Sequence, residues 1–155
     1  MIFASLGTMD MPFLRMAEAV DRYAATVEDK VIVQTGHTHF DYRYAEAFDF
    51  CTKDEMAEYI KTADILILQG GWGAISEAME QGKRIVVIPR HDKTEHIHDQ
   101  FQLIRKLDSL GCVIGVFDDC NLTEAIKKAR TFDFKQLPKG EAESLIRQRL
   151  KEWFE

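Results

Sequence analysis

The sequence has no excess of positively charged residues and no long apolar run. Its 20 Lys and Arg stand against 26 Asp and Glu, which gives a net charge of −6. It therefore lacks the clustered cations that broad contact with nucleic-acid phosphates requires. The longest apolar runs, such as 65–68, are far shorter than the roughly 20 residues that cross a bilayer. We expect neither a nucleic-acid partner nor direct membrane insertion.

Cysteine and targeting signals are also scarce. The three cysteines are an odd number without Cys-x-x-Cys spacing, which fits a reducing compartment. The first residues, Met-Ile-Phe-Ala-Ser, contain no basic segment that directs secretion. Both observations predict a cytoplasmic protein.

Two common nucleotide-binding motifs are missing. The dinucleotide fingerprint G-x-G-x-x-G does not follow the first apolar run, where only Gly7 is present, and there is no Gly-Lys-Ser/Thr of a Walker A loop. These absences argue against NAD and ATP enzymes. A sugar nucleotide remains a good candidate ligand for a domain with glycine-rich turns.

Short apolar runs alternate along the chain with segments of helical period. The runs predict strands at 1–6, 30–35, 44–50, 65–69, 84–89 and 112–116. The periodic segments predict helices from about 11, from 52 or 54 to 62, from the 70–73 turn to 82, and over 97–110, 122–130 and 141–153. Continuously apolar strands are typical of a parallel sheet buried on both faces. We therefore predict one α/β domain over residues 1–155, with a Rossmann-like doubly wound parallel sheet.

Glycine-rich turns follow several predicted strands. In open parallel sheets, ligands bind at the carboxyl ends of the strands, beside helix N-termini. Segment 70–74, Gly-Gly-Trp-Gly-Ala, carries the strongest such signal, because glycines admit close approach and a helix start presents free N–H groups to an anion. A diphosphate would fit there. A tight turn without a ligand is the alternative explanation.

Glu77 follows this turn by a few residues. Its carboxylate is a candidate acceptor for both ribose hydroxyls of a bound nucleotide. Alternatively, it is a first-turn acid that the helix dipole favours.

The five histidines fall in two segments, 37–39 and 91–98. One interpretation is a zinc site completed by nearby carboxylates. Another has His96 and Gln100 donating hydrogen bonds to hydroxyls or phosphate oxygens of a sugar diphosphate. Ordinary surface loops are the third interpretation.

Several motifs in chain order resemble the C-terminal domain of glycosyltransferase family 28. They cover nearly the whole chain from residue 1 to about 130 and comprise Met-Ile-Phe with Gly7 and Thr8, segment 31–37, segment 63–73 with Glu77, segment 86–90, and Glu95 with His96. The resemblance implies the C-terminal, donor-binding half of a GT-B fold. It is nearest to split members, in which each half is a separate polypeptide. These include exopolysaccharide and capsule glycosyltransferase pairs and the two-subunit enzyme that extends N-acetylglucosaminyl dolichol diphosphate.

By this resemblance, Gly7, Thr8 and the 70–74 turn approach the donor diphosphate, Glu77 binds the ribose, and segment 50–53 faces uracil. Asp99 and Gln100 fall where the family reads donor-sugar hydroxyls, and His96 matches a histidine just before that helix. With Gly36, which ends the second predicted strand, the candidate substrate-binding residues are Gly7, Thr8, Gly36, Phe50, Lys53, Gly70, Gly71, Gly73, Ala74, Glu77, His96, Asp99 and Gln100.

The chain departs from the family pattern at three places. Trp72 stands where the family usually has a small residue, and Gln69 where it often has histidine. The segment 95–111 is about one residue short.

The resemblance implies an inverting transfer of a hexose from a UDP-sugar to a lipid-diphosphate-linked saccharide. The helix N-terminus would stabilise the departing UDP without a metal or another cofactor. The general base is expected in a membrane-associated, acceptor-binding partner subunit, which would hold this chain at the inner membrane face. His37 is an outside candidate for that role.

Two other functions remain open. One is a non-catalytic nucleotide- or sugar-binding regulatory protein, and the other is a hydrolase or epimerase that acts alone, although such enzymes need two domains of this size. The last helix, 141–153, has Leu145, Ile146, Leu150, Trp153 and Phe154 near one face. It packs on its own sheet or anchors the partner subunit.

Overall fold

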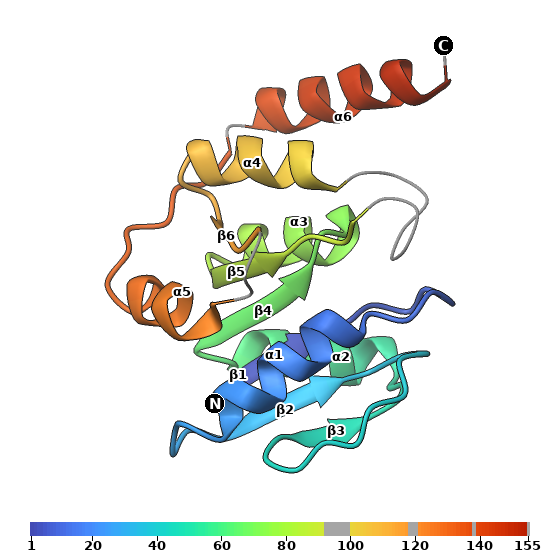
Figure 1. Cartoon of the computed structure of the whole chain (residues 1–155). Helices are drawn as coiled ribbons and strands as arrows, with labels where there is room; N and C mark the ends of the chain where they lie inside the picture. The colour runs from blue at the N-terminus through green and yellow to red at the C-terminus, as the bar shows by residue number, and fades with distance from the viewer. Residues whose placement is uncertain (92–99, 118–120, 138, 155) are drawn as a thin grey trace.

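A computed structural model of the chain describes residues 1–91, 100–117, 121–137 and 139–154. Six parallel strands form one sheet in the order β3-β2-β1-β4-β5-β6 (Figure 1). The strands are β1 Ile2–Ser5, β2 Val31–Gln34, β3 Glu46–Phe48, β4 Ile65–Gln69, β5 Arg84–Ile88 and β6 Ile114–Gly115. This order winds outward in both directions from β1 and β4, as in a Rossmann-like sheet. The predicted fold class is confirmed.

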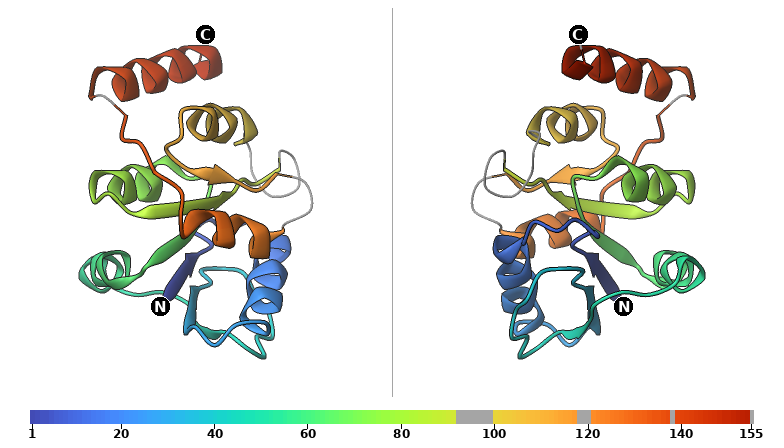
Figure 2. Two further views of the ribbon diagram at one scale, coloured as in Figure 1. Left: turned by 90° about the vertical axis from the view of Figure 1, so that its left-hand side faces the viewer. Right: turned by 90° about the vertical axis from the view of Figure 1, so that its right-hand side faces the viewer.

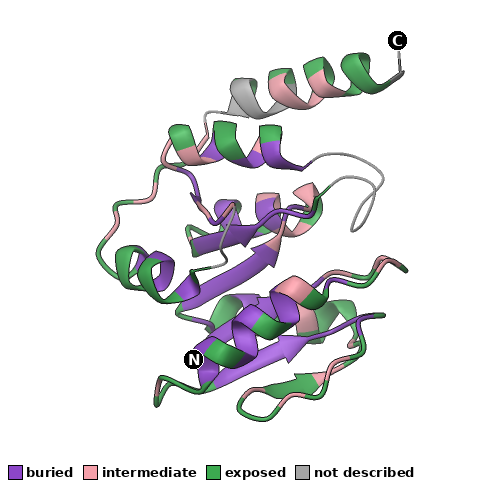
Figure 3. Cartoon of the chain, viewed as in Figure 1, coloured by how far each residue is buried: buried purple, intermediate pink, exposed green. Residues whose placement is uncertain are grey.

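Helices cover both faces of the sheet. They are α1 Leu14–Ala24, α2 Lys53–Thr62, α3 Trp72–Glu80, α4 Phe101–Ser109, α5 Leu122–Ala129 and α6 Lys139–Phe154. One buried cluster joins α1 and α5 to the sheet, and a second joins α2, α3 and α4 to the opposite face. Figure 2 shows α1 on one side and α2 and α3 on the other. Strands β1, β2, β4 and β5 are almost entirely buried on both faces (Figure 3) because their side chains alternate between the two clusters, whereas the edge strand β3 is largely exposed.

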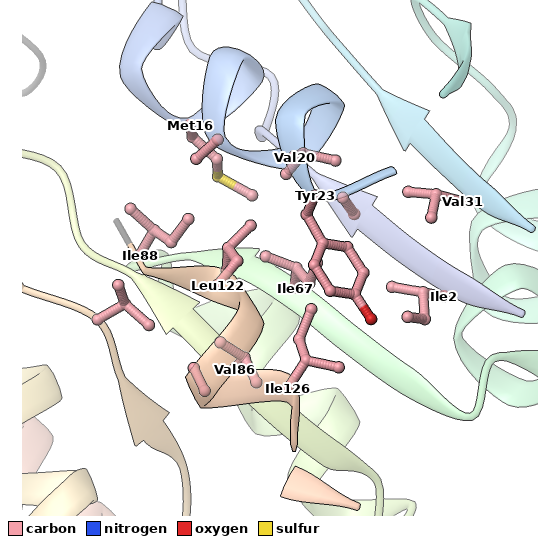
Figure 4. Close-up of a cluster of buried hydrophobic side chains, with 14 of the residues drawn as sticks. Ile2, Met16, Val20, Tyr23, Val31, Ile67, Val86, Ile88, Leu122 and Ile126 are labelled. Atoms are coloured by element: carbon pink, nitrogen blue, oxygen red, sulfur yellow. The ribbon is translucent and has the colours of Figure 1, made fainter. Parts of the chain in front are cut away.

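The cluster beneath α1 illustrates why the sequence folds this way. Met16, Val20 and Tyr23 recur at helical spacing on α1 and are buried against strand residues such as Ile67 and Val86 (Figure 4). These three residues form the buried apolar face of α1.

The last helix does not pack on the sheet. It lies outside α4 (Figures 1 and 2), and a hollow of about 280 Å³ between these two helices is lined by Leu103 and Leu145 among others. Leu150 and Trp153 of α6 remain 45% and 41% exposed. The side chain of Phe154 lies outside the described residues.

Two helix starts differ from the sequence prediction. Helix α1 begins at Leu14 rather than near residue 11, because the backbone of its N-cap, Phe13, has φ of −124° and ψ of 62° and is not helical. The Phe13 N–H donates to Thr38 Oγ1 at 2.9 Å. Helix α3 begins at Trp72, so Gly73 is its second residue and Glu77 its sixth. Residues 97–99 of the predicted 97–110 helix lie outside the described residues, and its described part is α4.

Among the described residues, no helix is both long and apolar enough to cross a membrane.

Candidate functional site

Two glycine turns meet where β1 and β4 end. The strands pair with Ser5 opposite Leu68, so Gly7 and Gly70 leave the sheet at the same edge. Between the turns lies the side chain of Gln69, whose Nε2 would stand 3.1 Å from a Cβ at Gly7 and 2.2 Å from one at Gly71. The side-chain amide of Gln69 therefore packs against both turns and separates them. The switch point of the sheet lies here, where doubly wound folds bind ligands.

The end of β2 is packed onto the same turn. Gly36 has φ of 57°, and a Cβ there would lie 2.2 Å from the Gly7 carbonyl oxygen. The buried Gln34 donates from Nε2 to that carbonyl at 3.2 Å and accepts from Ser5 Oγ at 2.7 Å. Gly36 is thus held beside Gly7 by both backbone contact and side-chain hydrogen bonds.

The N-terminus of α3 faces this edge. Gly71 is its N-cap and supplies no side-chain cap, and the first helical bond runs from Ile75 N to Gly71 O at 3.4 Å. The N–H groups of Trp72, Gly73 and Ala74 precede that bond and have no partner within the helix. They carry the positive end of the helix dipole.

The glycines of this turn are glycine for different reasons. A Cβ at Gly70 would lie 2.4 Å from Gln100 Oε1, and one at Gly71 would collide with Gln69. A Cβ at Gly70 would also lie 2.8 Å from the Gln100 Cβ, so packing excludes a side chain there, whereas a side chain at Gly71 requires the end of the Gln69 side chain to move. Around Gly73 a Cβ would meet nothing within 4 Å. Open space at Gly73, one of the first residues of α3, suits the approach of an anion to the helix N-terminus.

The spacing of Glu77 predicts a position in about the first turn of α3, but the residue lies further along the helix. It is the sixth residue of the helix and is exposed, and the first turn contains no acid. The helix dipole therefore does not account for it, because that effect falls off within the first turn.

Three candidate side chains, those of His37, Phe50 and Lys53, lie in the segments that follow β2 and β3. The ring of Phe50, which is 52% exposed, makes an edge contact with His37 at 5.1 Å between centroids. His37 Nε2 is also 3.4 Å from Asp10 Oδ1. Lys53 is the exposed first residue of α2. Beside Phe50, burial and the nearby Glu55 carboxylate raise the pKa of the Cys51 thiol, so Cys51 is not a thiolate nucleophile at neutral pH.

Gln100 is buried rather than open at the surface of the site. Its Oε1 accepts from the Arg90 N–H at 2.9 Å, and its Nε2 donates to Gln69 Oε1 at 3.1 Å. His96 and Asp99 lie outside the described residues. Among the described residues, no group of three His, Cys, Asp or Glu side chains lies close enough together to hold a metal ion.

The family comparison decides the assignment. The model named "Glycosyltransferase family 28 C-terminal domain" matches residues 7–152. The chain belongs to this family. A comparison with curated proteins finds no match.

Solved structures similar to this family 28 domain are glycosyltransferases. The glycotransferase of kitacinnamycin matches with a TM-score of 0.66 and 20% identity over 84% of this chain. The glycosyltransferase SnogD from Streptomyces nogalater matches with 0.63 and 18% over 83%, and the spinosyn forosaminyltransferase SpnP with 0.61 and 11% over 83%. The chain covers 34% of each of these proteins. The likeness supports the GT-B half predicted from the sequence.

Three polar residues of the family 28 domain were not predicted as site residues. Gln34, Gln69 and Arg90 hold the turns in place through the contacts of their side chains, and Arg90 is only 1% exposed. Each stands at or just beyond the carboxyl end of an apolar strand, where a polar residue interrupts the buried run. That interruption is the sequence signal that identifies them.

Proposed function

We propose that this domain binds the diphosphate of a UDP-sugar between the Gly7 turn and the N-terminus of α3. The observation that carries the proposal is the start of α3, where the N–H groups of Trp72, Gly73 and Ala74 have no partner within the helix and a Cβ at Gly73 would meet nothing within 4 Å. Backbone N–H groups and a helix N-terminus favour negative charge without a metal. Membership of the family 28 domain supports a sugar nucleotide as the ligand.

In this proposal the rest of the nucleotide lies along the same edge. The exposed carboxylate of Glu77 accepts the ribose hydroxyls, and the exposed ring of Phe50 with Lys53 faces uracil. His96, Asp99 and Gln100 would stand toward the donor sugar. The buried amide of Gln100 would act there from the floor of the site.

The proposed reaction is the inverting transfer of a hexose to a lipid-diphosphate-linked saccharide in exopolysaccharide or capsule synthesis. Breaking the glycosidic bond places negative charge on the departing UDP, and the N–H groups of the α3 turn point at that charge. The family 28 domain would thus supply leaving-group stabilisation.

We assign the acceptor site and the general base to a membrane-associated partner subunit. The similar glycosyltransferases are about two and a half times as long, because 83–84% of this chain covers 34% of each, and a transferase of this kind places acceptor and donor in a cleft between two domains. His37, half exposed and close to Asp10, is the candidate base within this chain.

Gly73→Ala tests the donor site. We expect UDP affinity, measured by isothermal titration calorimetry, to fall by about tenfold because the methyl group blocks a charged hydrogen bond. The free energy of unfolding should stay constant or rise by about 0.5–1 kcal/mol, since alanine is the better helix residue. Gly140→Ala is the matched control, because Gly140 is also the second residue of a helix with nothing near its Cβ. Equal UDP affinity in both variants would contradict the proposed site.

The partner is tested by UDP release. The isolated chain should bind UDP and release none from UDP-glucose, UDP-galactose or UDP-N-acetylglucosamine with a lipid-linked acceptor. Co-expression with the product of an adjacent reading frame that carries a hydrophobic N-terminal anchor should restore release, and EDTA should leave it unchanged. Rapid transfer by the isolated chain would contradict the two-subunit assignment.

A further inference from the structure

Arg90 lies beneath the donor site and is buried. It follows β5 directly after Pro89 and is 1% exposed. Its Nη2 donates to the Leu6 carbonyl and its Nη1 to the Met11 carbonyl, both at 2.8 Å. Its guanidinium also lies 4.7 Å from the centroid of the Phe13 ring. One side chain thus contacts both ends of the loop that connects β1 to α1.

The backbone of the same residue is tied to the other glycine turn. The Arg90 N–H donates to Gln100 Oε1, and Gln100 Nε2 donates to Gln69 Oε1. Gln69 in turn fills the space between Gly7 and Gly71. A continuous set of contacts therefore runs from the β1–α1 loop through Arg90 to the start of α3.

The geometry of arginine suits this position. A planar guanidinium donates in several fixed directions at once, whereas a lysine ammonium is a compact point charge on a flexible stem. The loop between β1 and α1 has little regular structure of its own, and Thr8 and Asp10 are exposed. Its position relative to α3 therefore depends on contacts with its two ends.

We propose that Arg90 is a positioning residue for the donor diphosphate. By holding the Leu6 and Met11 carbonyls, it keeps the Gly7 turn, whose own N–H donates to Ser5 Oγ at 3.3 Å, in place beside the start of α3. This inference rests on the proposed function, because it concerns the UDP site described above. The guanidinium does not touch the donor; it fixes the loop that does.

The experiment compares Arg90→Lys with Arg84→Lys. Arg84 lies at the opposite end of β5 and also donates to main-chain carbonyls, those of Ala129 and Arg130. Both variants keep the charge and lose the guanidinium. Two readouts are measured in each: hydrogen exchange of the amides of residues 7–11, and affinity for UDP and for uridine.

We expect Arg90→Lys alone to speed exchange over residues 7–11 and to weaken UDP binding by about tenfold, because hydrogen bonds from a charged donor are lost. Uridine, which has no phosphate, should bind with less than about twofold change, and a general loss of structure would weaken both ligands alike. Arg84→Lys should change neither readout. Unchanged exchange in Arg90→Lys, or an equal loss for UDP and uridine, would overturn the inference.

A second variant keeps the inference testable if Arg90→Lys does not fold. Gln100→Leu breaks the link from Arg90 to Gln69, and the same selective loss of UDP over uridine is expected, because neither ligand carries the donor hexose that Gln100 would contact. Equal affinity of Gln100→Leu and the wild-type protein for UDP would overturn the inference. If the wild-type protein itself binds no UDP, the proposed function fails, whereas slow exchange over residues 7–11 in Arg90→Lys refutes the positioning role alone.

Discussion

At the scale of single residues, Gly36 shows how the site depends on an absent methyl group. Its φ is 57°, and a Cβ would stand 2.2 Å from the carbonyl oxygen of Gly7. The left-handed conformation alone costs other residues about 1–2 kcal/mol. A contact of that length with backbone forces the chain itself to move.

Gly36→Ala should therefore lower the free energy of unfolding by about 3 kcal/mol or more, measured by urea denaturation. It should also weaken UDP binding, because Gly7 is displaced. Gly82→Ala is the control: Gly82 has φ of 66°, but the nearest atom to its Cβ is a flexible side-chain nitrogen at 3.7 Å. We expect a loss of about 1 kcal/mol there. If both variants lose a similar free energy of unfolding, the backbone near Gly7 can move at little cost and the steric argument is contradicted.

Sequence patterns locate the glycines of the site but not the side chains that hold them. Gly7, Gly36 and Gly70 end apolar runs, so they are visible in one sequence. The contact between Gln100 and Gln69 joins residues 31 positions apart. Such pairing depends on the order of the strands, which local patterns do not contain.

At the scale of elements, α2 has the best-defined start. Thr52 Oγ1 accepts from the Glu55 N–H at 3.2 Å, and the Glu55 carboxylate accepts from the Thr52 N–H at 2.7 Å. This is a capping box, and it resolves the sequence alternatives in favour of Thr52 over Asp54. These hydrogen bonds hold the pKa of Glu55 below its usual value.

A carboxylate with a lowered pKa in the folded state stabilises the protein above its unfolded-state pKa, and the contribution disappears as pH falls through the folded-state value. The difference in unfolding free energy between the wild-type protein and Glu55→Gln should therefore be present at pH 7 and shrink as the pH falls below about 4. Urea denaturation at several pH values measures it. Glu58→Gln, an exposed change later in α2, is the control and should show no such trend.

Element types follow from periodicity, whereas their ends depend on distant partners. The predicted strand 65–69 agrees with β4 because its apolar run ends sharply at Gln69. Helix α1 begins later than its periodicity predicts, and the Phe13 N–H at its start donates to the Thr38 hydroxyl of another loop. Local sequence does not show such a partner.

At the scale of the whole molecule, α6 presents apolar surface away from the sheet. Leu150 and Trp153 are exposed, and the Arg149 guanidinium lies 5.5 Å from the Trp153 ring centroid. Exposed aromatics beside arginine are typical of protein interfaces. We therefore assign the partner contact to this helix.

The double variant Leu150→Glu, Trp153→Glu should change the free energy of unfolding by less than about 1 kcal/mol, because both side chains are partly exposed. It should abolish co-purification with the co-expressed partner. Tyr44→Glu, at a residue 63% exposed in the loop before β3, should leave co-purification intact. Retained co-purification of the double variant would exclude α6 as the partner contact.

The Gln69 amide between the two glycine turns affects how ligand binding depends on pH. Gln69, Gln100 and Arg90 gain or lose no proton between pH 7.5 and 9, and neither do the surrounding main-chain groups. Over that range the charge of these groups and of the ligand's diphosphate stays constant, so UDP affinity should vary by less than about twofold. A histidine in place of Gln69 would make the same pocket responsive to acidity.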